Sequence, residues 1–180
     1  ADELQSLRAL LGDASILLDD RGTMAQRMEA ARQLSVSADP RALPFVRAAS
    51  RSDESEIRAL AVSVASNWKS AEAVDLLVQC AQRERDEEIM EAAFQALEDL
   101  SMPESGEALY IMAGSETLAN DRRARASQAL ESAYPELLAD RGAPSHGSDR
   151  LGMTAAVAAN GLVGGMALGS VGVFTGPLRR

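Results

Sequence analysis

Apolar residues recur every three or four positions through the first 140 residues of the chain. Val74, Leu77, Val78 and Ala81, for example, would share one face of a helix, because an α-helix completes a turn in about 3.6 residues. No stretch alternates between apolar and polar residues with a period of two for long enough to form a strand. The pattern therefore predicts an all-α fold.

The helical pattern itself repeats with a period near thirty residues. Corresponding alanines are separated by 30, 32 and 33 residues, and a second apolar helical segment lies between each of them and the next. A fixed period with two helices per repeat is typical of an α-solenoid. The corresponding alanines are Ala31, Ala61, Ala93 and Ala126.

Helix ends are marked by acidic residues, asparagine and proline. We expect the side chains of residues 52–55, 86–88 and 120–121 to accept hydrogen bonds from the free amides of the helices that follow. Prolines are expected to end one helix or begin the next, or, at Pro44, to occupy a first turn. The prolines at such boundaries are Pro40, Pro103 and Pro135.

The first helical segment, residues 2–19, has an amphipathic pattern and is expected to cap the solenoid as a half-repeat. Gly12 and Asp13 are predicted to break it into two helices. The solenoid is predicted to span residues 1–140, and residues 141–150, rich in Gly, Pro and Ser, to form a linker.

The repeat core resembles a known family. In residues 53–61 an acidic residue opens the helix, Ile57-Arg58 follows, and an alanine pair comes next. This order is similar to the HEAT-type repeats of the short bacterial class, typified by phycobilin-lyase-like repeats, and the similarity covers about residues 24–138. The resemblance implies a protein-binding scaffold, although a few such proteins attach bilin pigments. The chain departs from the pattern at Arg125, where an apolar residue is expected, and around residues 101–106, where the third repeat is longer.

The last part of the chain has a different composition. No charged side chain occurs between Leu151 and Leu178. A helix over residues 151–176 would be roughly 39 Å long, which is enough to cross a bilayer core of about 30 Å. We therefore predict a single transmembrane helix over residues 151–178. The alternatives are a helix buried in a soluble assembly, a sorting tail that a processing enzyme removes, and the first span of a longer protein.

Small residues recur along this predicted helix and would form one smooth face, a glycine zipper. Such a face lets a second helix approach closely in lipid, and Asn160 beside it can hydrogen-bond across helices. We expect this face to pack against integral membrane subunits or against copies of the same chain. The predicted packing residues are Ala158, Gly161, Gly165, Gly169, Gly172 and Gly176.

Two arginines, Arg179 and Arg180, follow the apolar segment. By the positive-inside rule they would remain cytoplasmic and leave the solenoid outside, in the periplasm. A first residue of Ala1 fits the end left by signal peptidase. Together these features predict a single-pass membrane protein with an extracytoplasmic solenoid.

Charge and rare residues limit the chemistry that we expect. The net charge is −9, and without the two terminal arginines it is −11 for residues 1–150, which argues against a nucleic-acid partner. Cys80 and His146 are the sole residues of their types and lie far apart. They predict no disulfide within the chain, no zinc site and no catalytic triad. We expect no catalytic residue, metal or cofactor, and hence no enzyme.

Three residues are candidates for binding a protein partner. Trp68 would serve as an anchor if exposed, although packing between repeats is the favoured interpretation. Arg122 and Arg123, in the basic run 122–125, can bind a carboxylate or phosphate, although salt bridges to nearby Glu and Asp residues are the favoured account.

The sequence thus predicts a membrane-anchored scaffold or accessory subunit whose solenoid binds a protein. An alternative is a channel or pore in which the tail forms a homo-oligomer and the solenoid its vestibule. A second alternative, from the family resemblance alone, is a lyase-like protein that handles a pigment.

Overall fold

A computed structural model describes residues 2–19 and 21–144, and all regular structure in these residues is helical. The prediction of an all-α domain is confirmed for this part of the chain. The predicted transmembrane helix and its glycine face lie outside the described residues. The elements are α1 (Asp2–Leu18), α2 (Met24–Ser37), the 3-10 helix η1 (Pro40–Ala42), α3 (Leu43–Ala49), α4 (Ser55–Ala65), α5 (Ala71–Arg83), α6 (Glu87–Asp99), α7 (Pro103–Gly114), α8 (Asn120–Ala133) and α9 (Pro135–Arg141).

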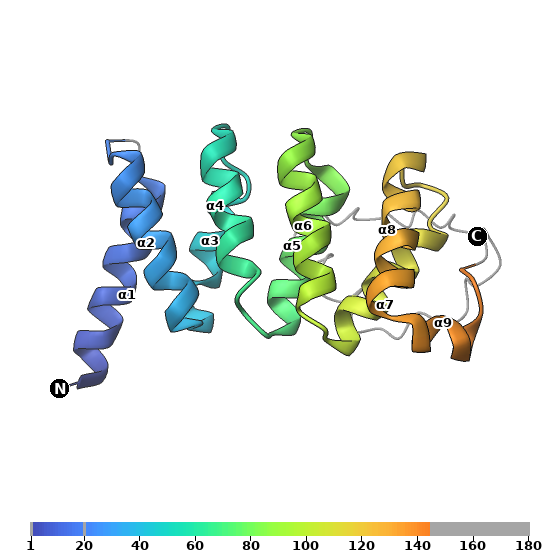
Figure 1. Ribbon diagram of the computed structural model, residues 1–180. Coiled ribbons are helices and arrows are strands. Elements are labelled where there is room, and N and C mark those ends of the chain that lie inside the picture. Colours follow the sequence, from blue (N-terminus) through green and yellow to red (C-terminus); the bar gives the residue numbers. More distant parts are fainter. Residues whose placement is uncertain (1, 20, 145–180) are drawn as a thin grey trace, which may run out of the picture. The chain divides into compact units, whose positions relative to one another are not determined.

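The helices form two layers (Figure 1). One layer contains α2, α4, α6 and α8, each in contact with the next, and the other contains α1, α3, α5 and α7. Each repeat therefore packs mainly on its neighbours in sequence, which is the arrangement of an α-solenoid. None of the helices in residues 2–19 and 21–144 has the length and apolar content needed to span a bilayer.

The corresponding alanines explain the close packing of the first layer. Ala31, Ala61, Ala93 and Ala126 lie on α2, α4, α6 and α8, and all four are buried. Their small side chains let adjacent helices approach, and larger residues fill the space between the two layers. The largest of the fully buried side chains include Leu34, Leu76, Leu77, Phe94, Leu97, Leu109 and Leu130.

The predicted helix boundaries are confirmed where prolines mark them. Pro40, Pro103 and Pro135 begin η1, α7 and α9, and Pro44 lies in the first turn of α3. The predicted acidic cap of α6 is also present, because Asp86 accepts a hydrogen bond from the amide of Glu88 at 3.0 Å.

Two other predicted caps are wrong. Glu54 and Asn120 lie at the starts of α4 and α8, but neither helix has a side-chain cap. The carboxylate of Glu54 accepts a hydrogen bond from Arg27 instead, and the side-chain oxygen of Asn120 accepts one from Arg123. Arginine side chains thus donate hydrogen bonds to the side-chain oxygens that we expected to accept them from the helix amides.

The predicted break at Gly12 and Asp13 is also wrong, since α1 is continuous from Asp2 to Leu18. A glycine inside a helix costs only about 1 kcal/mol relative to alanine. Leu10, Ala14 and Leu17 are buried against the core on the same helix, and this packing outweighs the cost.

After the longer third repeat, α7 packs closely against Tyr134, the residue between α8 and α9. Ser101 adopts a left-handed conformation (φ 50°) and the chain then turns into α7. A Cβ atom at Gly106 of α7 would lie 2.8 Å from the ring of Tyr134. The Tyr134 hydroxyl donates a hydrogen bond to the Leu97 carbonyl at 3.0 Å. Glycine at this position therefore permits the close approach of α7 to the residue that precedes α9.

Candidate functional site

The residues predicted to pack in the membrane lie outside the described part of the chain. They are Ala158, Asn160, Gly161, Gly165, Gly169, Gly172 and Gly176, together with the two arginines Arg179 and Arg180. Their roles stay predictions.

Trp68 lies in the loop between α4 and α5 and is only 3% exposed. Its indole nitrogen donates a hydrogen bond of 3.0 Å to the carbonyl of Leu34 on α2. The side chain therefore joins two repeats and presents no surface to a partner. Of the two interpretations of Trp68, packing between repeats is the one that this geometry matches.

Arg122 and Arg123 lie near the start of α8, and each donates a hydrogen bond within the domain. Arg122 donates to the carbonyls of Ala81, at 3.1 Å, and Glu84 at the end of α5. Arg123 donates to Asn120. In the described residues neither arginine forms an ion pair with the nearby acidic side chains that we expected as partners. The basic run 122–125 therefore does not form an open anion site.

Arg125 explains the departure from the apolar repeat pattern. Its guanidinium lies 2.6 Å from a carboxylate oxygen of Glu91 and 2.6 Å from one of Glu98, both on α6. It also lies 5.4 Å from the centroid of the buried Phe94 ring. Hydrogen bonding from Arg125 holds the pKa of Glu91 below its usual value. The arginine thus fills a core-facing position by pairing its charge and stacking on an aromatic ring.

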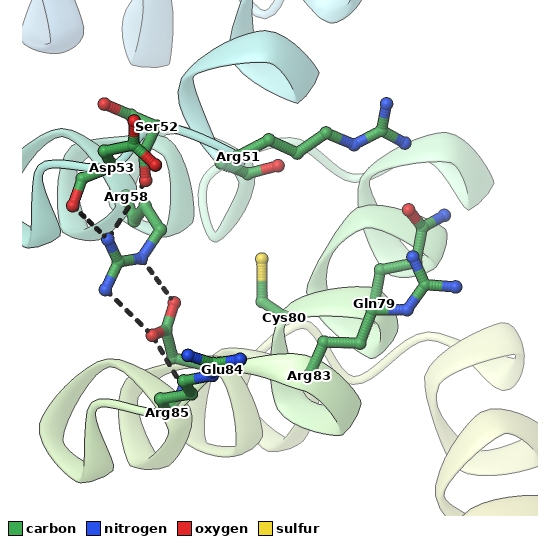
Figure 2. A pocket seen from close by; sticks show the side chains of 10 residues that line it. Arg51, Ser52, Asp53, Arg58, Gln79, Cys80, Arg83, Glu84 and Arg85 are labelled. Atoms are coloured by element: carbon green, nitrogen blue, oxygen red, sulfur yellow. Dashed lines mark hydrogen bonds and ion pairs between the residues drawn. The ribbon is translucent and has the colours of Figure 1, made fainter.

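A basic pocket of about 430 Å³ opens between the loop after α3 and the carboxyl end of α5. Figure 2 shows its lining, which includes four arginines in an otherwise acidic chain. Gln79 and Cys80 of α5 and two serines of the loop complete much of the surface. The arginines are Arg51, Arg58, Arg83 and Arg85.

One wall of the basic pocket is fixed by an ion pair between Arg58 and Glu84. Two guanidinium nitrogens of Arg58 donate to the two carboxylate oxygens of Glu84 at 2.9 and 3.1 Å. The third nitrogen donates to the carbonyls of Ser52 and Asp53, each at 3.0 Å. Glu84 also accepts hydrogen bonds from the amides of Arg85 and Asp86. Burial acts to raise the pKa of Glu84, but these hydrogen bonds outweigh it and hold the pKa below its usual value.

Cys80 lies on the floor of the basic pocket and is 8% exposed. Burial, with the nearby charge of Glu84 as a smaller cause, raises the pKa of the thiol to about 11. A thiol with this pKa carries almost no thiolate at neutral pH, so it is a poor nucleophile. The geometry agrees with the interpretation of Cys80 as a small buried residue.

A second hollow, the α2–α4 groove, runs along the layer of α2 and α4 and has a volume of about 660 Å³. Its lining is largely apolar and includes Met28, Val36 and Leu60. Met28 is 56% exposed and Val36 is 75% exposed. The α2–α4 groove thus brings two exposed apolar side chains, one near each end of α2, to the same open surface.

Sequence reasoning missed both hollows. The lining of the basic pocket comes from residues 50–53, 58, 79–80 and 83–85, and none of these stretches is a basic run. The α2–α4 groove depends on how two helices are rotated, which the helical period alone does not fix. In the part of the chain that the structure describes, no three metal-binding side chains converge.

The comparisons with known proteins agree with this architecture. Residues 48–131 match the family model of HEAT repeats, a segment that runs from α3 to α8. No curated protein matches the chain.

Proposed function

We propose that the chain, whose residues 48–131 match the family model of HEAT repeats, is a non-enzymatic scaffold that binds a protein partner at a membrane. Stacked helical repeats offer long continuous surfaces to other proteins. The observation that carries the proposal is the α2–α4 groove, with the exposed side chains of Met28 and Val36.

The lining of the α2–α4 groove supports a helical partner. Ala25 and Ala31 are small enough to admit an apolar side chain between Met28 on α2 and Leu60 on α4. Ser35, Ser63 and Asn67 provide polar groups in the same lining. An amphipathic helix that inserts one apolar side chain and leaves its polar face in water matches this surface.

The sequence of the tail supports the membrane part of the proposal. The uncharged segment 151–178 is long enough to cross a bilayer as a helix, and its glycine zipper suits packing against integral subunits. Arg179 and Arg180 favour an extracytoplasmic solenoid. The scaffold would then bind its partner outside the cytoplasm.

The test is purification of the full chain from its own membranes in mild detergent, with mass spectrometry of the proteins that accompany it. A partner that binds the solenoid should co-purify with the unmodified chain and should be lost from the double variant Met28→Glu/Val36→Glu. The control is Ile111→Glu, which changes a 41%-exposed apolar residue on α7, away from the groove. Circular dichroism of each variant verifies that the helices are intact.

Each of the following results would contradict one part of the proposal. Equal recovery of partners with the groove variant would exclude the groove as the binding surface. Recovery of the chain without detergent would contradict the membrane tether. If the chain purifies alone as a homo-oligomer and conducts ions in liposomes, the result would contradict the scaffold function and support the pore function.

A further inference from the structure

We propose that the basic pocket binds an acidic peptide segment of the protein partner, with Arg51 and Arg83 contacting its carboxylates. The inference rests on the proposed scaffold role and specifies the chemistry of one part of the partner. It concerns a different surface from the α2–α4 groove.

The charge balance of the basic pocket favours an anionic ligand. Four arginines face two acidic residues, Asp53 and Glu84, in a chain whose net charge is −9. Glu84 already accepts hydrogen bonds from Arg58 and from two backbone amides, so its charge is compensated. Apart from Glu84, Asp53 is the one acidic residue in the lining beside Arg51, Arg83 and Arg85.

The hydrogen bonds within the domain distinguish Arg58, which has a structural role, from the arginines that we propose for ligand binding. Each guanidinium nitrogen of Arg58 donates to Glu84 or to a loop carbonyl, so we assign Arg58 to the structure of the pocket wall and not to ligand binding. Arg51 and Arg83 are exposed, and within the described residues neither forms an ion pair. Figure 2 shows both on the same side of Cys80 as Gln79, with the Arg58–Glu84 pair on the other side. Two planar guanidinium groups with free donors suit bidentate recognition of carboxylates.

Size and screening favour a short peptide over other anions. The volume of about 430 Å³ lies in the range of sites that hold drug-sized ligands, roughly 300–1,000 Å³, and far exceeds what a single small anion fills. Charges more than about 8 Å apart are largely screened at physiological ionic strength. A short acidic segment therefore responds mainly to the arginines, whereas a long polyanion such as nucleic acid would also meet the acidic surface around them.

The test is fluorescence anisotropy with a short labelled peptide of alternating Asp and Glu, titrated with the full chain in mild detergent at physiological ionic strength. The variant Arg51→Gln/Arg83→Gln should weaken binding by about tenfold or more, because it removes two charge-assisted contacts. The control Arg8→Gln/Arg21→Gln removes the same charge from exposed positions outside the pocket and should change binding less than about twofold. Circular dichroism verifies that both variants are folded.

Three results would overturn the inference. The first is that the unmodified chain does not bind the peptide. The second is that both double variants weaken binding equally. The third is that inorganic phosphate at constant ionic strength displaces the peptide. The last result would assign the pocket to a small anion. Absence of peptide binding in a chain that still co-purifies with partners would refute the pocket inference alone. Peptide binding by a chain that purifies without any partner would support the pocket and refute the scaffold.

Discussion

The Arg58 guanidinium and the Glu84 carboxylate form a two-point ion pair, with nitrogen–oxygen distances of 2.9 and 3.1 Å, between α4 and the end of α5. A corresponding ion pair with a single contact occurs one repeat earlier, where Arg27 of α2 lies 2.9 Å from Glu54. Each arginine also donates to a carbonyl of the loop before its own helix. The arginine thus ties its own loop to the corresponding loop of the next repeat.

We predict that Glu84→Gln lowers the free energy of unfolding by about 2 kcal/mol, because it leaves the Arg58 charge without its partner in a partly buried site. The control is Glu29→Gln, which removes the partner of Arg32 in a surface pair with both side chains more than half exposed. This control should have little effect. Urea denaturation of both variants measures the difference, and equal stabilities would contradict a structural role for the Arg58–Glu84 pair.

The same ion pair predicts a dependence of stability on pH. Burial opposes ionisation of Glu84, but the hydrogen bonds from Arg58 and two amides leave its pKa below the ordinary value of 4.5. A carboxylate whose pKa is lower in the folded state stabilises the fold above the unfolded-state pKa, and this contribution is lost as the pH falls through the folded-state pKa. The unfolding free energy should therefore decline below about pH 4.5, and less steeply in Glu84→Gln. Identical acid slopes in the two proteins would contradict the lowered pKa.

Two helical glycines should respond in opposite directions to alanine. Gly106→Ala would place a Cβ atom 2.8 Å from the Tyr134 ring and should destabilise the protein by about 1–3 kcal/mol. Gly12→Ala adds a Cβ atom with no neighbour within 4 Å and should stabilise it by about 0.5–1 kcal/mol. Thermal unfolding of both variants measures the difference. A stabilising Gly106→Ala would mean that α7 and Tyr134 can separate at little cost.

The solenoid could be predicted from the sequence because its packing follows a strict repeat. Ala31, Ala61, Ala93 and Ala126 are buried at corresponding helix positions, so close helix contacts and sequence period coincide. The break at Gly12 was wrong because local helix preference is weak beside burial of neighbouring leucines. The expected caps at Glu54 and Asn120 failed because long-range arginine contacts, which have no local signature, took their oxygen atoms.

The candidate sites were less predictable for a geometric reason. Arg51 and Arg83 are 32 positions apart in the sequence and line one pocket only because α3 and α5 are neighbours in their layer. The contiguous run at 122–125 was conspicuous, yet Arg122 and Arg125 are occupied by carbonyls of another helix and by two glutamates. Arginines that are adjacent in the sequence therefore need not form a free basic cluster in the fold.

Trp68 should affect stability and leave partner binding unchanged. Trp68→Phe removes the hydrogen bond to the Leu34 carbonyl and part of the buried ring, and should cost about 1–2 kcal/mol. The Leu34 carbonyl also accepts hydrogen bonds from Ala38 and Ser37, so the loss leaves no unsatisfied acceptor. Calorimetry measures the stability, and co-purification below the unfolding temperature measures binding. Loss of partners from a folded variant would contradict a purely internal role.

Cys80 provides a sensitive test of the floor of the basic pocket, because it is the sole cysteine of the chain. A rise in its pKa from 9.0 to about 11 reduces the thiolate fraction at pH 8 by about 100-fold. Alkylation by iodoacetamide should therefore be at least about 100-fold slower in the folded protein than in the denatured chain. Equal rates would show that the floor is open to solvent. An uncharged floor is also what the proposed ligand requires, because a thiolate would compete with its carboxylates for the arginines. Cys80→Ala should accordingly retain binding of the acidic peptide.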